Sequence, residues 1–119
     1  MAFPQSRPRR LRQSPALREL VAEVRLGVSD VVAPLFVREG ITAPQPISSL
    51  SGVMQHTLKS LKEEVRTLAD LGVPGVILFG VPAVKDEVGS GAFDPNGIVQ
   101  VALRELHEEL GNRIVLMAD

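Results

Sequence analysis

The sequence predicts an α/β fold built on a parallel sheet. Three short apolar segments with strand character, at 31–37, 75–80 and 114–117, are separated by two segments of helical periodicity. Strands that alternate with helices of about 10–15 residues are typical of βαβ units, in which consecutive strands run parallel. The 119 residues are 45% hydrophobic and 23% charged, which is the composition of a folded domain rather than of a disordered chain.

The amino-terminal residues differ from the rest in charge. Residues 1–18 contain five arginines and no acidic residue, whereas residues 19–119 contain 8 basic and 14 acidic residues. Residues 1–13 are therefore predicted to form a basic arm, extended around Pro8, in front of a folded region at 14–119. Charge alone leaves three interpretations of this arm: it binds nucleic acid, directs the protein to an organelle, or contacts an acidic neighbouring subunit.

A short helix is predicted directly after the arm. Ser14 is a suitable N-cap, and Pro15 suits the first helical position. Gly27 is the predicted end of this helix. Between these signals, four apolar residues recur at the spacing of one helix face: Leu17, Leu20, Val21 and Val24.

The first strand and second helix come next. In the strand at 31–37, Pro34 requires an irregular or edge position, because it has no N–H to donate. Residues 41–56 contain several prolines, serines and a glycine and predict a loop. Thr57 is the expected cap of the second helix and Gly72 its end. Its apolar face consists of Leu58, Leu61, Val65, Leu68 and Leu71.

The second strand, at 75–80, is apolar between two glycines, as expected of a strand buried on both faces. A long loop is predicted over 81–96. Asp94 or Asn96 is the expected cap of the third helix, which ends at Gly111. Its apolar face consists of Val99, Ala102, Leu103, Leu106 and Leu110.

This order leaves an apolar last strand that needs further cover. A (β/α)8 barrel takes about 250 residues, so residues 14–119 would form its first third, truncated after the third strand. A flavodoxin-like sheet of about five strands would also be incomplete at this point. We therefore expect the chain to be part of a larger α/β domain.

Asp119 is the principal candidate for a catalytic group. It follows the third predicted strand, and active sites of α/β proteins lie at the carboxyl ends of the strands. A carboxylate there can bind an amine, orient a substrate or ligate a metal, although it can also simply cap a helix. The loop at 85–91 matches no phosphate-binding motif and is interpreted as a surface loop. Lys85 is not an expected nucleophile, because the carboxylates of Asp86 and Glu87 that follow it favour the protonated ammonium form, which cannot attack.

Other classes of site find little support. The chain has no cysteine, which excludes disulfides and thiolate metal sites, and no metal-binding spacing links His56 and His107. We predict no cofactor-binding residue and no metal ligand within the chain. Apolar runs are too short to cross a membrane, and no secretory signal peptide is evident.

Several short motifs extend over nearly the whole sequence. They include Arg-Pro-Arg-Arg-Leu-Arg at 7–12, Asp-Val-Val-Ala-Pro-Leu-Phe-Val-Arg-Glu-Gly at 30–40, Pro-Ile-Ser-Ser-Leu-Ser-Gly-Val at 46–53, Leu-Phe-Gly-Val-Pro at 78–82, Lys-Asp at 85–86, Gly-Ser at 89–90, Asp-Pro-Asn-Gly at 94–97 and Val-Leu-Met-Ala-Asp at 115–119. In this order and spacing they resemble the delta-aminolevulinic acid dehydratase, or porphobilinogen synthase, family. Residues 50–56 depart from the family pattern, which leaves the role of that loop open.

The resemblance implies a fold and an activity. The fold is a (β/α)8 TIM barrel preceded by an extended amino-terminal arm, which wraps a neighbouring subunit in a homo-oligomer, usually an octamer. The activity is that of a hydro-lyase of tetrapyrrole biosynthesis, which condenses two 5-aminolevulinate molecules to porphobilinogen with loss of water. The cytoplasm is the expected location, with no nucleic-acid or membrane partner.

The resemblance also implies where the chemistry resides. The family uses two Schiff-base lysines and zinc or magnesium, and the residues that provide them lie beyond Asp119. Asp119 alone matches an active-site position, so the chain by itself is expected to be inactive. Two further classes compete with this interpretation. One is a small nucleic-acid-binding or adaptor module that uses the basic arm, and the other is a nucleotide-binding half-sheet, which the missing phosphate loop opposes.

Overall fold

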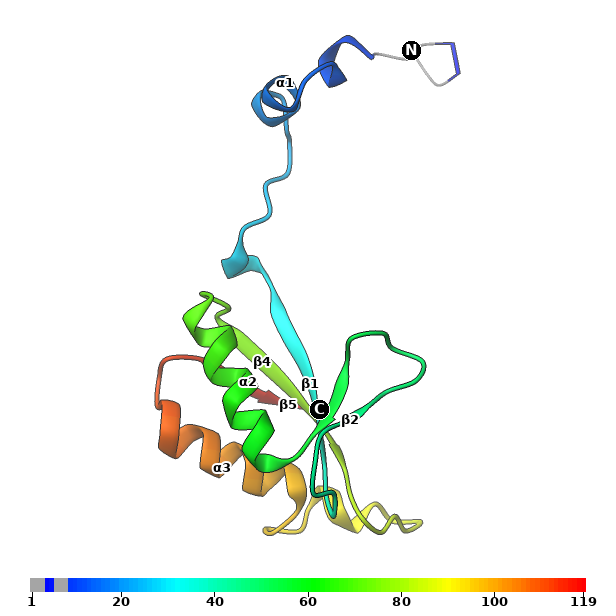
Figure 1. The fold of residues 1–119 in the computed structure, drawn as a ribbon, viewed down its shortest axis with the longest axis vertical. Coiled ribbons are helices and arrows are strands. Elements are labelled where there is room, and N and C mark those ends of the chain that lie inside the picture. Colours follow the sequence, from blue (N-terminus) through cyan, green and yellow to red (C-terminus); the bar gives the residue numbers. More distant parts are fainter. Residues whose placement is uncertain (1–3, 6–8) are drawn as a thin grey trace.

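The computed structural model describes residues 4–5 and 9–119. A five-stranded sheet carries two long helices on one face, and the amino-terminal segment extends away from this body (Figure 1). Part of the predicted basic arm, at 1–3 and 6–8, lies outside the described residues. No helix in the described part of the chain is long and apolar enough to cross a membrane.

The sheet has the strand order β2-β3-β1-β4-β5. Its parallel members are β1 (Val32–Arg38), β4 (Gly75–Val81), β5 (Val115–Ala118) and β3 (Met54–His56), while β2 (Gln45–Pro46) runs antiparallel to β3. The prediction of a loop over 41–56 was therefore wrong, because this segment contains the β2–β3 hairpin. Strands of two and three residues are too short to show periodicity, and their pairing depends on the neighbouring edge of β1.

Pro34 occupies the position that its chemistry requires. β1 pairs with β4 along its whole length, but β3 pairs only with Phe36 and Val37. Pro34 therefore lies where β1 has a single neighbour, and its missing N–H interrupts no continuous ladder on the β3 side.

Two helices cover one face of the sheet: α2 (Leu58–Asp70) and α3 (Ile98–Leu110). Side chains alternate between the faces of a strand, so every second residue of β1 and β4 points at these helices. The resulting core contains Leu35, Val37, Leu61, Val65, Val76, Leu78, Ala102, Leu106, Leu110 and Ile114. The other face remains uncovered by any described helix and carries Phe36 stacked on Phe79, with ring centroids 5.3 Å apart.

Ion pairs join the two helices at their outer side. Lys62 pairs with Glu105 at 2.7 Å, Arg66 pairs with Glu109, and Arg113, just beyond α3, pairs with Asp70 at 2.7 Å. Because these side chains are partly exposed, each pair adds little to stability on its own. Their common effect is to align α2 with α3.

The predicted helix termini were only partly right. Thr57 caps α2 as expected, in a capping box with Ser60, and Gly111 follows the last residue of α3. The N-cap of α3 is Gly97 rather than Asp94 or Asn96. A Cβ at Gly97 would lie 2.4 Å from the Gly91 carbonyl oxygen, so the close approach of the preceding loop requires glycine here.

The first helix, α1 (Pro15–Leu20), is shorter than predicted. It begins as expected, since Ser14 Oγ accepts a hydrogen bond from the Leu17 N–H at 3.1 Å, but it ends seven residues before Gly27. Most of its predicted apolar face is exposed, since Leu20 and Val24 are 78% and 77% exposed and only Leu17 is partly buried. A short amphipathic helix without a packing partner has little to stabilise further turns.

Candidate active site

Three parallel strands, β1, β4 and β5, end at the same edge of the sheet. The segments that follow β1 and β4 are joined there by two hydrogen bonds. Glu39 donates its N–H to the Val81 carbonyl at 2.9 Å, and its Oε2 accepts from the Ala83 N–H at 3.0 Å. Because active sites of parallel α/β folds lie at this edge, it is the first place to look for chemistry.

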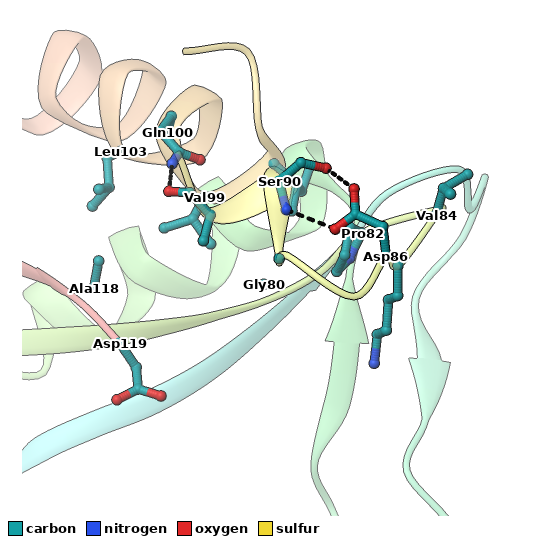
Figure 2. Close-up of a pocket in the computed structure, with 15 residues that line it drawn as sticks. Gly80, Pro82, Val84, Asp86, Ser90, Val99, Gln100, Leu103, Ala118 and Asp119 are labelled. Atoms are coloured by element: carbon teal, nitrogen blue, oxygen red, sulfur yellow. Dashed lines mark hydrogen bonds between the residues drawn. The ribbon is translucent and has the colours of Figure 1, made fainter. Parts of the chain in front are cut away.

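Asp119 lies at this edge, as the sequence predicted. Its N–H donates to the Leu78 carbonyl at 3.2 Å, which extends the β4–β5 pairing one residue beyond Ala118. Figure 2 shows Ala118 directed toward Leu103 of α3 and Asp119 directed to the opposite side. The exposed Asp119 carboxylate thus belongs to the face that carries Phe36 and Phe79, where it can accept hydrogen bonds from a ligand.

A pocket of about 380 Å³ lies beside this edge, on the helix side (Figure 2). The loop after β4, the first turns of α3 and the end of β5 line it, and Ile98, Val99, Leu103 and Ala118 make much of its surface apolar. The pocket is therefore a groove between α3 and the ends of β4 and β5. Asp119 also lines this pocket, although Figure 2 shows its side chain directed away from Leu103, so the pocket and the candidate carboxylate lie at the same edge of the sheet.

The loop at 85–91 is an ordered surface loop. Asp86 accepts hydrogen bonds from the Ser90 hydroxyl and, at 2.9 Å, from the Ser90 N–H. These hydrogen bonds from Ser90 lower the pKa of the Asp86 carboxyl below its ordinary value. Gly89 adopts φ of 64°, a left-handed conformation that favours glycine. Asp86 and Gly89 therefore shape the loop, and Asp86 is already engaged within it.

Gly80 sets how closely α3 approaches the end of β4. A Cβ at this position would lie 2.3 Å from Val99 Cγ2 and 3.1 Å from Ile98 Cγ2. We expect Gly80→Ala to lower the free energy of unfolding by about 1–3 kcal/mol, because a β-branched neighbour cannot easily move aside. Urea denaturation of the chain measures this. Gly91→Ala is the matched control, since its Cβ would lie at an ordinary 3.5 Å from Pro82, and equal losses for both variants would contradict the argument.

Neither histidine lines the pocket, although His56, the last residue of β3, pairs with Val37 one residue before the end of β1. His56 is buried between β3 and α2, and His107 is exposed on α3. Among residues 4–5 and 9–119, no group of three histidine or acidic side chains could hold a metal ion.

Two polar residues at the end of β1 were missed at the sequence level. Arg38 donates to Gln55 Oε1 at 3.0 Å and Gln45 Oε1 at 3.5 Å, and Glu39 makes the two bonds described above. Both residues directly follow the apolar run of β1, and this position at the carboxyl end of a predicted strand could have identified them as candidates. Their partners depend on the hairpin and on strand register, which the sequence did not reveal.

Comparison with known proteins gives a consistent result. A family model described as delta-aminolevulinic acid dehydratase matches residues 5–119. The delta-aminolevulinic acid dehydratases of Streptomyces coelicolor and Mycobacterium leprae are 47% and 50% identical over 120 and 119 residues, which is 99% and 98% of this chain. The chain spans only 36% of the length of either relative.

A solved structure is similar as well. It is the delta-aminolevulinic acid dehydratase of Toxoplasma gondii ME49 in complex with the reaction product porphobilinogen, with a TM-score of 0.77 and 32% sequence identity. The match covers 97% of this chain and 33% of that one. It confirms the predicted fold class, in which β1, α2, β4, α3 and β5 form part of a (β/α)8 barrel.

Proposed function

The chain belongs to the delta-aminolevulinic acid dehydratase family, and from this premise we propose that it forms the first third of a porphobilinogen synthase barrel. The complete enzyme would condense two 5-aminolevulinate molecules to porphobilinogen with loss of water, in tetrapyrrole biosynthesis. The family match over 5–119 carries this proposal. The comparisons give no support to a nucleic-acid-binding or adaptor module.

Asp119 is the residue of this chain to which we assign chemistry. Its carboxylate, exposed beside an apolar face, can hold the ammonium group of 5-aminolevulinate or transfer a proton during the condensation. Zinc or magnesium would act as a Lewis acid in the complete enzyme. The resemblance to the family assigns its ligands to residues beyond Asp119.

A chimera tests the proposal directly. Residues 1–119 would replace the matching segment of the Streptomyces coelicolor relative, which is 47% identical over this region. We expect the chimera to form porphobilinogen from 5-aminolevulinate at a rate of the same order as its parent, measured by colorimetric assay. A chimera that assembles like its parent but yields no porphobilinogen would contradict the proposal.

The chain alone should form no porphobilinogen. The resemblance places both Schiff-base lysines beyond Asp119, and the three lysines of this chain have other surroundings. Lys59 lies on the surface of α2, Lys62 pairs with Glu105 and Lys85 lies in the loop after β4. Borohydride treatment with 5-aminolevulinate should therefore leave the mass of the chain unchanged. A stoichiometric adduct at Lys85 would show that this prediction is wrong.

Residues 1–13 are proposed to be an assembly arm that contacts a neighbouring subunit of a homo-oligomer, with an octamer as the expected state. In support, Arg10–Arg12 form an exposed helical turn on a segment that extends away from the body (Figure 1). Deleting residues 1–13 from the chimera should shift it to smaller assemblies in sedimentation velocity. The undeleted chimera is the control, and an unchanged sedimentation coefficient would refute the assignment.

A further inference from the structure

His56 connects the β2–β3 hairpin to the helix that follows it. It is only 9% exposed, and it provides one of the two residue pairs between β3 and β1, opposite Val37. Its Nδ1 lies 3.0 Å from Ser60 Oγ on the first turn of α2. The imidazole is therefore packed between a short strand pairing and a helix start.

The Ser60 hydroxyl also takes part in the capping box at the start of α2. Its oxygen accepts the Thr57 N–H at 3.0 Å, while the Ser60 N–H donates to Thr57 Oγ1 at 3.1 Å, which together cap α2. A neutral imidazole that carries its hydrogen on Nε2 can accept a hydrogen bond from the Ser60 hydroxyl at Nδ1. A protonated imidazole must donate to the same oxygen, and the Ser60 hydroxyl is then left to donate to the Thr57 carbonyl, which lies 3.4 Å away.

The surroundings oppose a positive charge on this imidazole. The cavity beside it, about 270 Å³ in volume, is lined mainly by apolar residues of β1 and the hairpin, among them Ala33, Leu35 and Val53. The ring also precedes the amino terminus of α2, where the helix dipole disfavours a cation. Among the described residues, Glu64 is the one other titratable group that lines this cavity, and its carboxylate favours the protonated ring.

Burial dominates this balance and lowers the pKa of His56 below its ordinary value of 6.5. In the folded chain the imidazole therefore resists protonation, whereas after opening it takes up a proton readily. The stability of the closed hairpin is complete above pH 6.5 and declines as the pH falls below that value.

We propose that the β2–β3 hairpin is an acid-sensitive latch on β1, opened by protonation of His56. Opening would separate Gln55 and Gln45 from Arg38, which both glutamines hold at the end of β1. Acid would thereby free a guanidinium group at the candidate active-site edge. This inference depends on the hairpin contacts and stands independently of the proposed enzymatic activity.

Hydrogen exchange of the 119-residue chain tests the latch. Between about pH 7.5 and pH 5, after correction for intrinsic rates, we expect residues 45–56 to lose protection while β4 retains it. The chain has two histidines, which provide a matched pair of variants. His107→Gln should keep the acid response of the hairpin, and His56→Gln should abolish it.

Two further measurements keep the test decisive if His56→Gln fails to fold. Glu64→Gln should enlarge the acid-induced loss of protection, because it removes the carboxylate that favours the protonated ring in the closed state. In the unaltered chain, NMR signals of the His56 ring and of the hairpin amides should titrate together. The proposal is overturned by a persistent acid response in His56→Gln, by a diminished response in Glu64→Gln, or by separate titrations.

Discussion

Replacing Asp119 with asparagine should lower turnover of the porphobilinogen-forming chimera at least about a hundredfold, the lower end of a general acid–base contribution. The amide retains the size of the side chain but loses the charge that holds an ammonium and the ability to take up a proton. Folding and assembly should be unchanged, because Asp119 is exposed and its N–H bond to Leu78 involves only the backbone.

Initial rates of the purified chimera measure its turnover, and sedimentation velocity measures its assembly. Asp70→Asn is the matched control, since Asp70 is another exposed carboxylate, paired with Arg113 far from the carboxyl edge of the sheet. Its turnover should stay near that of the unaltered chimera. Near-normal turnover of Asp119→Asn would reduce Asp119 to a structural carboxylate and leave this chain without an assigned catalytic group.

Leu106→Ala should destabilise the chain far more than the truncation of an exposed leucine. Leu106 is fully buried on α3 among the side chains that join both helices to the sheet. Truncating such a leucine removes apolar contacts and leaves a cavity, which costs about 2–5 kcal/mol. The loss is comparable with the total stability of many small domains, so a large fraction of the chain would unfold.

Urea denaturation followed by circular dichroism measures this effect as a lower midpoint. Leu71→Ala is the control, because Leu71 is 67% exposed at the end of α2. We expect its free energy of unfolding to change by less than about 0.5 kcal/mol. Equal midpoints for the two variants would mean that α3 does not contribute to a cooperative core.

The parts of the fold that local rules govern were predictable from the sequence. The α2 start at Thr57, the α3 end at Gly111 and the apolar strand at 75–80 depend on neighbouring residues and on side-chain period. The hairpin at 45–56 and the short α1 were mispredicted. Their extent depends on whether another part of the molecule covers them, and periodicity carries no such information.

In the candidate site, too, features that depend on neighbouring residues were predictable, and features that depend on distant contacts were not. The position of Asp119 followed from its place after a strand, because parallel strands end at one edge. The contacts of Arg38 with Gln45 and Gln55 depend on the register of a hairpin that the sequence did not predict. The contact between His56 and Ser60 required knowing that a strand, rather than a loop, leads into α2. The catalytic role of Asp119 itself stays a prediction until turnover is measured.

The placement of β4 between β1 and β5 has a consequence for biosynthesis. A ribosome delivers β1, α2 and β4 before α3 and β5, and β1 pairs with β4 over seven residues in register. The β1–α2–β4 unit can therefore assemble while later residues are still being translated, and it presents the free edge of β4 as a template for β5. β5 then joins an existing edge, so the sheet needs no rearrangement as the polypeptide emerges.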